Sequence, residues 1–115
     1  MILSRSPIRK RRSTPRRGRV VDQAFLSWMH ATQPCLLSLR VPGHICIGPK
    51  TFHHIRTCGN PKDDRRGLML CAWAHQVTWN GRSSIEALGK SGFQDHWKVD
   101  IEAEIRRYNE TYEVS

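Results

Sequence analysis

Apolar side chains recur at helical spacing just after residue 21. Phe25, Trp28 and Met29 fall at positions i, i+3 and i+4, which places them on one face of a helix. Asp22 stands where a capping side chain is needed, and Pro34 cannot continue a helix. The pattern predicts a short amphipathic helix between these two residues.

A second helical stripe occupies the C-terminal part of the chain. Ile101, Ile105, Tyr108 and Tyr112 fall at i, i+4, i+7 and i+11, and Asp100 is suited to cap the first turn. Acidic side chains follow in that turn, where the helix dipole favours them. This is the clearest helix that the sequence predicts.

A third helix is predicted from a capping box. Ser83 is followed three residues later by Glu86, the spacing at which the two side chains can bond each other's backbone N–H groups. Gly89 and Gly92 weaken the helical pattern that follows.

Between these helices the pattern changes to short β-prone runs. Residues 51–56 predict a strand that carries an adjacent histidine pair, residues 57–66 contain Gly-Asn-Pro and predict a loop, and residues 68–70 predict a second strand. Residues 71–75 then predict the first turn of a helix. Upstream, two β-prone pieces around the Pro42-Gly43 turn predict a ribbon that brings Cys35 and Cys46 together.

The chain has 115 residues, of which 38% are apolar, so we expect one domain with a small core. No apolar run approaches the roughly 20 residues that a membrane-spanning helix needs. The charge divides the chain into a basic arm, residues 1–21, and a domain, residues 22–115.

Nearly all of the formal net charge of +9 lies in the arm. It holds eight of the 19 basic side chains and no acid, which leaves 11 basic against 10 acidic residues in the domain. Like charges that repel, broken by Pro7, Pro15 and Gly18, predict that the arm is disordered in isolation. No apolar stretch follows the arm, as a secretory signal would require. We therefore expect a cytoplasmic location and no export.

Such an arm is suited to neutralise nucleic-acid phosphates without reading sequence. The alternatives that stay open are an organelle transit peptide, a mistaken start codon and a solubilising tail. The arm residues that we expect to contact nucleic acid are Arg9, Lys10, Arg11, Arg12, Arg16 and Arg17.

All four cysteines and four of the six histidines lie within residues 35–75. Reduced thiols in such a cluster suggest structural Zn²⁺, which takes four ligands in a tetrahedron. Cys35, Cys46 and Cys71 are the first three candidates. Ala74 stands where a fourth ligand would be expected, and the alternative is that the cysteines are small apolar core residues. The remaining candidates for the fourth ligand are Cys58, His44 and His75.

His53 and His54 form the second chemical signal. Adjacent side chains on a regular strand point to opposite faces, so the two histidines are expected to have separate roles. One imidazole can bind a metal ion while the other accepts a proton near neutral pH. The alternative is a pair of polar surface or satisfied core residues.

The order of these signals resembles the small phage-associated HNH endonucleases of the ββα-metal superfamily, and in particular the phage and prophage group with a zinc-stabilised core and a helical C-terminus. The similarity covers about residues 24–108. It rests on the order Cys35, Cys46, His53-His54-Ile55, Lys62-Asp63-Asp64-Arg65, Leu70-Cys71 and His75, followed by Gly89-Lys90 and Phe93. The fold that this implies is α+β, a small ββα-metal (HNH) core with flanking N- and C-terminal helices.

The resemblance also implies a role for each matching position. His53 would bind the catalytic divalent cation and His54 would activate the attacking water. Asn60, with Asp64 as the next candidate, would fix the backbone and the base. His75 and Glu86 would complete the cation site, with Glu86 at a place where relatives often carry histidine.

The implied activity is hydrolysis of DNA phosphodiester bonds with Mg²⁺ or another divalent cation, in phage DNA metabolism or recombination. No membrane and no small-molecule cofactor are expected, and a homodimer or a phage recombination partner is compatible with this function in a bacterial or phage-encoded setting. Basic residues near the loop that would grip phosphates are Arg56, Lys62, Arg65 and Arg66, or these form a solvated loop face.

Two further hypotheses stay open, because Ala74 stands at a position where relatives carry a zinc ligand. If His75 took that place, the catalytic cation would lose a ligand. The chain would then be a degenerate nuclease relative that binds DNA without cutting it. A separate hypothesis, from another class, is a zinc-ribbon DNA-binding accessory protein without catalysis.

Overall fold

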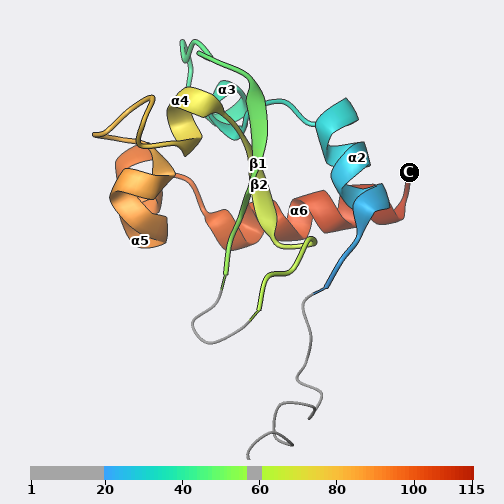
Figure 1. Cartoon of the computed structure of the whole chain (residues 1–115). Helices are drawn as coiled ribbons and strands as arrows, with labels where there is room; N and C mark the ends of the chain where they lie inside the picture. The colour runs from blue at the N-terminus through green and yellow to red at the C-terminus, as the bar shows by residue number, and fades with distance from the viewer. Residues whose placement is uncertain (1–19, 57–60) are drawn as a thin grey trace, which may run out of the picture.

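The computed structural model describes residues 20–56 and 61–115, in which five helices surround a two-stranded antiparallel sheet (Figure 1). This arrangement is of the predicted α+β class. The predicted basic arm, apart from its last two residues, lies outside the described residues, as do Cys58 and Asn60. The elements are α2 (Gln23–Thr32), α3 (Leu36–Arg40), β1 (Lys50–His54), β2 (Gly67–Cys71), α4 (Ala72–His75), α5 (Ile85–Trp97) and α6 (Ile101–Glu113).

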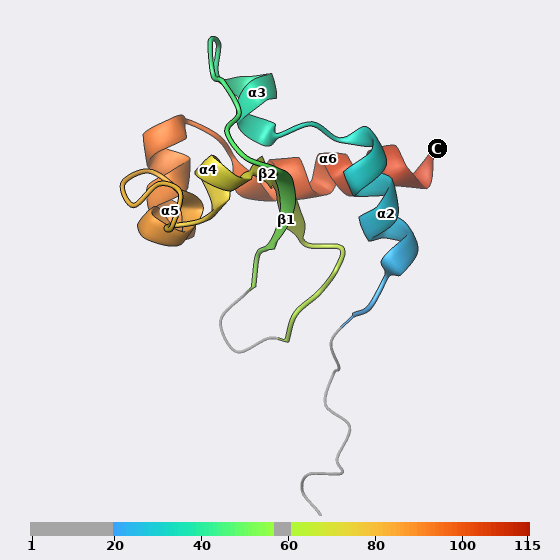
Figure 2. The same cartoon turned by 45° about the horizontal axis from the view of Figure 1, so that its top comes forward.

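The hairpin of β1 and β2 is the centre of the domain. Lys50 pairs with Cys71 at one end and His54 with Gly67 at the other. Every residue of β2 is buried, whereas those of β1 are half-buried. The helix α4 follows β2 directly and lies between the hairpin and α5 (Figure 2). The sequence prediction of two strands followed by a helical turn is therefore confirmed.

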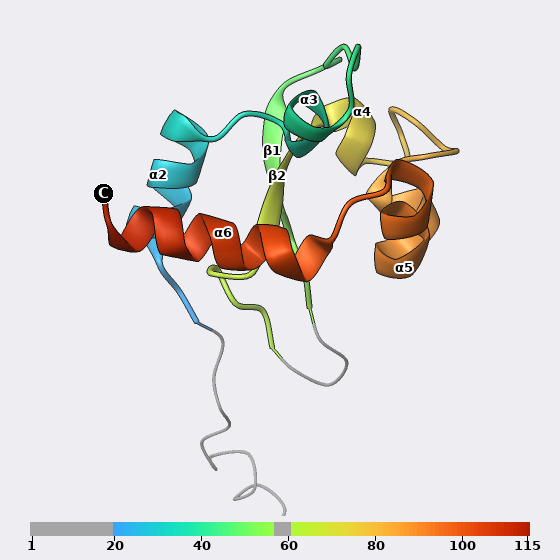
Figure 3. The same cartoon turned by 180° about the vertical axis from the view of Figure 1, so that it is seen from behind.

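The long helix α6 crosses the face of the hairpin that Figure 3 turns towards the viewer, with α2 near one end of the helix and α5 near the other. Its predicted stripe is the buried face, since Ile101, Ile105 and Tyr108 are at most 5% exposed. Tyr112 continues the stripe to α2, where its ring lies 5.1 Å from that of Trp28. Packing of this face against the hairpin stabilises both elements.

The predicted caps of α2 and α6 are present. The Asp22 carboxylate accepts a hydrogen bond from the Phe25 N–H, and the Asp100 carboxylate accepts one from the Ala103 N–H. The cap of α5 is one residue away from its predicted place. Ser84, not Ser83, accepts the bond from the Ala87 N–H, because the Ser83 hydroxyl accepts from the Asn80 amide.

The predicted ribbon between Cys35 and Cys46 is wrong in its first half, where the helix α3 forms. Leu36 and Leu37 are both fully buried. Adjacent residues of a strand point to opposite faces, whereas a helical turn against the core buries both of these side chains. The Ser38 hydroxyl and backbone N–H both donate to the Cys35 carbonyl and close the first turn.

The chain enters the domain beside the loop that joins the two strands. The Val20 N–H donates to the Lys62 carbonyl, and the Asp64 N–H donates to the Val20 carbonyl. Within the described segments, none of the helices has both the length and the apolar character needed to cross a bilayer.

Candidate metal centre and histidine pair

Four potential metal ligands converge next to the start of α4. The ligand atoms of Cys35, His44, Cys46 and Cys71 all lie within 4.8 Å of one another. Four ligands bound to zinc at about 2.3 Å in a tetrahedron lie roughly 3.8 Å apart, so the set fits a structural zinc ion. We call this set the Cys3His cluster. Among the residues that the structure describes, no other His, Cys, Asp and Glu side chains form such a group.

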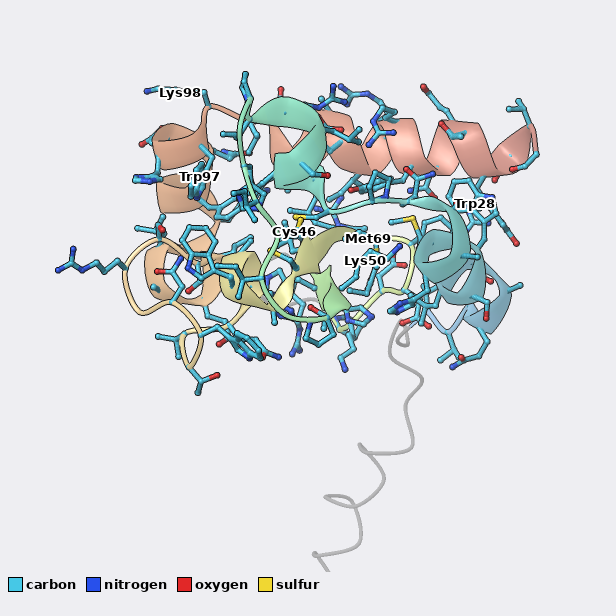
Figure 4. The ribbon with its side chains drawn as sticks, turned by 90° about the horizontal axis from the view of Figure 1, so that it is seen from above. Trp28, Cys46, Lys50, Met69, Trp97 and Lys98 are labelled. Carbon is cyan, nitrogen blue, oxygen red and sulfur yellow. The ribbon has the colours of Figure 1, made fainter. Side chains whose placement is uncertain are left out.

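Three separate segments supply the ligands. Cys35 is the N-cap of α3, and Cys71 ends β2 and is the N-cap of α4. His44 and Cys46 lie in the loop between α3 and β1, and sulfur atoms gather beside Cys46 in Figure 4. A bound ion would therefore cross-link three separate segments of the chain.

The loop that carries His44 and Cys46 is fastened to α4 through its backbone. The Trp73 N–H donates to the Ile47 carbonyl, and the Ala72 N–H donates to the Pro49 carbonyl. Gly48 lies between these bonds with φ +84°, and a Cβ there would lie 2.7 Å from the Ala72 side chain. Only glycine allows this approach without strain.

The protonation of the cluster is suited to a cation. Burial, reinforced by the neighbouring thiols, raises the pKa of Cys46 to about 12 and also raises the pKa of Cys35. Thiolates therefore require a positive charge among them, which zinc would supply. Burial also lowers the pKa of His44, so that its ring is neutral and has a lone pair to donate.

The structure also identifies the fourth ligand among the candidates. His44 Nε2 lies 3.7 Å from Cys71 Sγ, whereas His75 lies against His53. Cys58 lies outside the described residues. His44 thus occupies the place in the cluster that Ala74 leaves open, and the Cys3His cluster does not need His75.

His53 and His75 form a second, smaller group between β1 and α4. Their ring centroids are 4.7 Å apart. Burial and the neighbouring His75 ring lower the pKa of His53 to about 4, and burial lowers the pKa of His75. Both rings are therefore neutral near pH 7, the form in which imidazole binds metal ions.

Glu86 lies at the edge of this pair. Its negative charge opposes the lowering of both histidine pKa values, as a carboxylate near the two rings does. Its side chain is exposed, and Oε1 accepts a hydrogen bond of 3.0 Å from the Val77 N–H. With His53 and His75 it does not make a three-ligand group comparable to the Cys3His cluster.

His54 lies on the other face of β1, together with Phe52, whose ring centroid is 4.9 Å from its own. Its Nε2 lies 2.9 Å from Oδ1 of Asp64, which is only 4% exposed. The other carboxylate oxygen of Asp64 accepts a 2.8 Å bond from the Asp22 N–H. The partner of His54 is thus a carboxylate whose orientation is fixed from two sides.

The basic side chains near the loop differ in their contacts. Arg65 bonds the Asp22 carboxylate at 2.8 Å, and its guanidinium lies over the Tyr112 ring. Arg66 makes a two-pronged ion pair with Glu102. Both guanidiniums therefore connect the loop to the helices. The basic side chains that are exposed at either side of the loop are Arg56 and Lys62.

Thr51, a residue that the sequence analysis did not single out, contacts His75 of the His53–His75 group. Thr51 Oγ1 lies 2.6 Å from Nδ1 of His75. The signal was its place two residues before His53, which puts both side chains on the same face of the strand.

Comparison with known proteins finds no matching family model, no matching curated protein and no matching solved structure.

Proposed function

We propose that this protein is a metal-dependent DNA endonuclease of the HNH type, which hydrolyses phosphodiester bonds. One observation carries the proposal. The succession β1, β2, α4 brings His53 and His75 together, and His54, next in the chain to His53, has a buried carboxylate partner. A strand pair and a helix that converge histidines in this way support the ββα-metal interpretation of the sequence.

His53 and His75 would hold the catalytic divalent cation, with Glu86 at the edge of the site. Two neutral imidazoles side by side favour such binding, because neither ring has to lose a proton first. When bound, an ion such as Mg²⁺ or Mn²⁺ supplies neutralisation of the charge that develops on the phosphate and the leaving oxygen.

His54 would act as the general base. If Nε2–H donates to Asp64, the lone pair of Nδ1 remains for the proton of the attacking water. The carboxylate holds the ring in this tautomer and stabilises the imidazolium that forms, in the same way as the aspartate of other acid–base pairs. Asp64 would thereby take the positioning role, for which it was the second candidate after Asn60, a residue outside the described part of the chain.

DNA would be held mainly through its phosphates. Arg56 and Lys62 are exposed beside His54 and Asp64 in sequence. Val20 pairs with the same loop, so the basic sequence that precedes it joins the domain next to His54. Contacts of this kind position a duplex without reading its sequence, and they weaken as salt is added.

The Cys3His cluster would hold Zn²⁺ in a structural role. The ion would fix the end of β2 and the start of α4, and with them the position of His75 relative to His53. The predicted DNA partner, phage setting and cytoplasmic location remain part of the proposal.

Supercoiled plasmid nicking tests the proposal. The wild-type protein, with Mg²⁺ or Mn²⁺, is expected to convert the plasmid to the open circle, and chelator is expected to stop the reaction. His54→Ala should cut at least about 100-fold more slowly, because a general base contributes roughly 10²–10⁴-fold. The matched control is His30→Ala, which changes a histidine on the exposed face of α2. Equal nicking by both variants would show that the activity is a contaminant.

A binding-only function is the second candidate, and one observation favours it. In the described part of the chain, the proposed catalytic cation would have two imidazoles and an exposed carboxylate as ligands. The ligand atoms of these three side chains do not lie close together as those of the Cys3His cluster do. A degenerate relative would retard DNA in a gel, more weakly as salt rises, without nicking it under any of the cations.

A further inference from the structure

We propose that Thr51 is a positioning residue that holds His75 in the tautomer with Nδ1 protonated, so that Nε2 is available to a divalent cation. This inference rests on the proposed function for its purpose, but its geometry stands independently. It concerns a residue outside the positions that the resemblance to HNH endonucleases supplies.

The register of the hairpin places Thr51 beside His75. Thr51 pairs with Leu70, and the chain turns into α4 only two residues after Leu70. His75 ends that short helix and lies over the face of β1 that carries Thr51 and His53. The ring of His75 is thus contacted from the strand by a hydroxyl and by an imidazole.

The one proton of the Thr51 hydroxyl decides whether Oγ1 donates to or accepts from each of its two neighbours, the Leu70 carbonyl and His75 Nδ1. The hydroxyl has a single proton, and Oγ1 donates it to the Leu70 carbonyl at 3.2 Å. With its proton on the Leu70 carbonyl, the same oxygen, 2.6 Å from Nδ1 of His75, accepts from that nitrogen. This assignment puts the ring proton on Nδ1 and the lone pair of the neutral ring on Nε2.

This arrangement is what a metal-binding histidine needs. A ligating imidazole usually donates its other N–H to an oxygen that fixes both its tautomer and its orientation, and loss of that oxygen costs roughly 10–100-fold in metal affinity. Thr51 also suits the task because a β-branched side chain on a strand has few rotamers. Its hydroxyl is therefore held at the position that Nδ1 requires.

The test compares Thr51→Val, Thr51→Ser and the wild-type protein by two measurements. Nitrogen-15 NMR of the histidine rings reports the tautomer of His75, whose signals are assigned by their loss in His75→Gln. Titration with Mn²⁺ reports cation affinity. The control is Thr111→Val, which removes an exposed hydroxyl that bonds a backbone carbonyl on α6.

We expect the wild type and Thr51→Ser to show His75 with Nδ1 protonated, and Thr51→Val to lose this tautomer and to bind Mn²⁺ roughly 10–100-fold more weakly. Thr111→Val should match the wild type in both measurements. An unchanged tautomer in Thr51→Val, or a wild-type ring protonated on Nε2, would overturn the inference. If the wild type binds no Mn²⁺ although the tautomer depends on Thr51, the cation site and with it the proposed function fail, while the role of Thr51 in setting the tautomer stands.

Discussion

His54 Nε2 lies 2.9 Å from the carboxylate of Asp64, and this contact joins the end of β1 to the loop that leads into β2. Asp64 is buried and also accepts the backbone N–H of Asp22 at the start of α2. One carboxylate therefore connects the proposed base, the loop between the strands and the first helix. Its removal is expected to affect both stability and the orientation of His54.

Asp64→Ala should lower the free energy of unfolding by roughly 1–3 kcal/mol, because a partly buried backbone N–H and an imidazole lose their acceptor. Urea denaturation measures this change. Asp95→Ala, on the exposed side of α5, is the control and should stay within about 0.5 kcal/mol of the wild type. An Asp64→Ala variant as stable as the control would show that the contact contributes nothing.

The ion pairs of Glu102 predict a pH dependence of stability. Hydrogen bonds from Arg66 and Lys90 lower the pKa of Glu102 from its ordinary value of 4.5 to about 2. Because the native state favours the charged form, the stabilisation is fully present above the unfolded pKa. It is lost as the pH falls through the native pKa, in the window from about 4.5 to about 2.

Thermal unfolding of Glu102→Gln tests this dependence. The variant should have a lower Tm than the wild type at pH 7, and the difference should shrink as the pH is lowered towards 2. Glu110→Gln, an exposed position on the same helix, should show a smaller difference at every pH. A constant difference for Glu102→Gln across this range would contradict the pKa assignment.

Gly89 gives α5 a kink. Its φ of 75° and ψ of 175° lie in a region that is essentially reserved for glycine, although a Cβ there would meet no atom within 4 Å. Gly89→Ala should therefore destabilise the domain by roughly 1–3 kcal/mol through backbone strain alone. Ser91→Ala, two residues away and exposed, is the control in the same denaturation series. Greater stability of Gly89→Ala would mean that the backbone relaxes to a regular helix at no cost.

The elements that were predicted correctly from the sequence have local signals. The helices α2 and α6 begin with a capping aspartate and continue with an apolar stripe, and the hairpin follows from short apolar runs on either side of a loop. In each case the residues that determine the element are near one another in sequence. Burial against the rest of the domain then agrees with the local preference.

The sequence was misleading where tertiary packing decides. Leu36 and Leu37 belong to a β-prone run, but the core buries both, and a helical turn does this where a strand cannot. The choice of Ser84 over Ser83 as a cap depends on the Asn80 amide, which contacts Ser83. Neither outcome could be read from the local pattern.

The candidate site was predictable in its residue types but not in its grouping. Three cysteine ligands followed from the clustering, whereas the fourth depends on which loop residue reaches them in space. The only hint was that His44 lies two residues before Cys46, within the same loop. The position of Thr51 two residues before His53 puts it on the same strand face, but its contact with His75 depends on how α4 packs over that face.

Zinc content tests the structural metal site, because an ion in the Cys3His cluster would fix the strand–helix unit on which the proposed catalytic site depends. Protein purified without chelator, analysed by native mass spectrometry and by elemental analysis, is expected to carry about one zinc ion per chain. His44→Ala should bind it more weakly, while His96→Ala, an exposed histidine on α5, should match the wild type. A folded wild-type protein that contains almost no zinc and takes up none when it is added would contradict the claim.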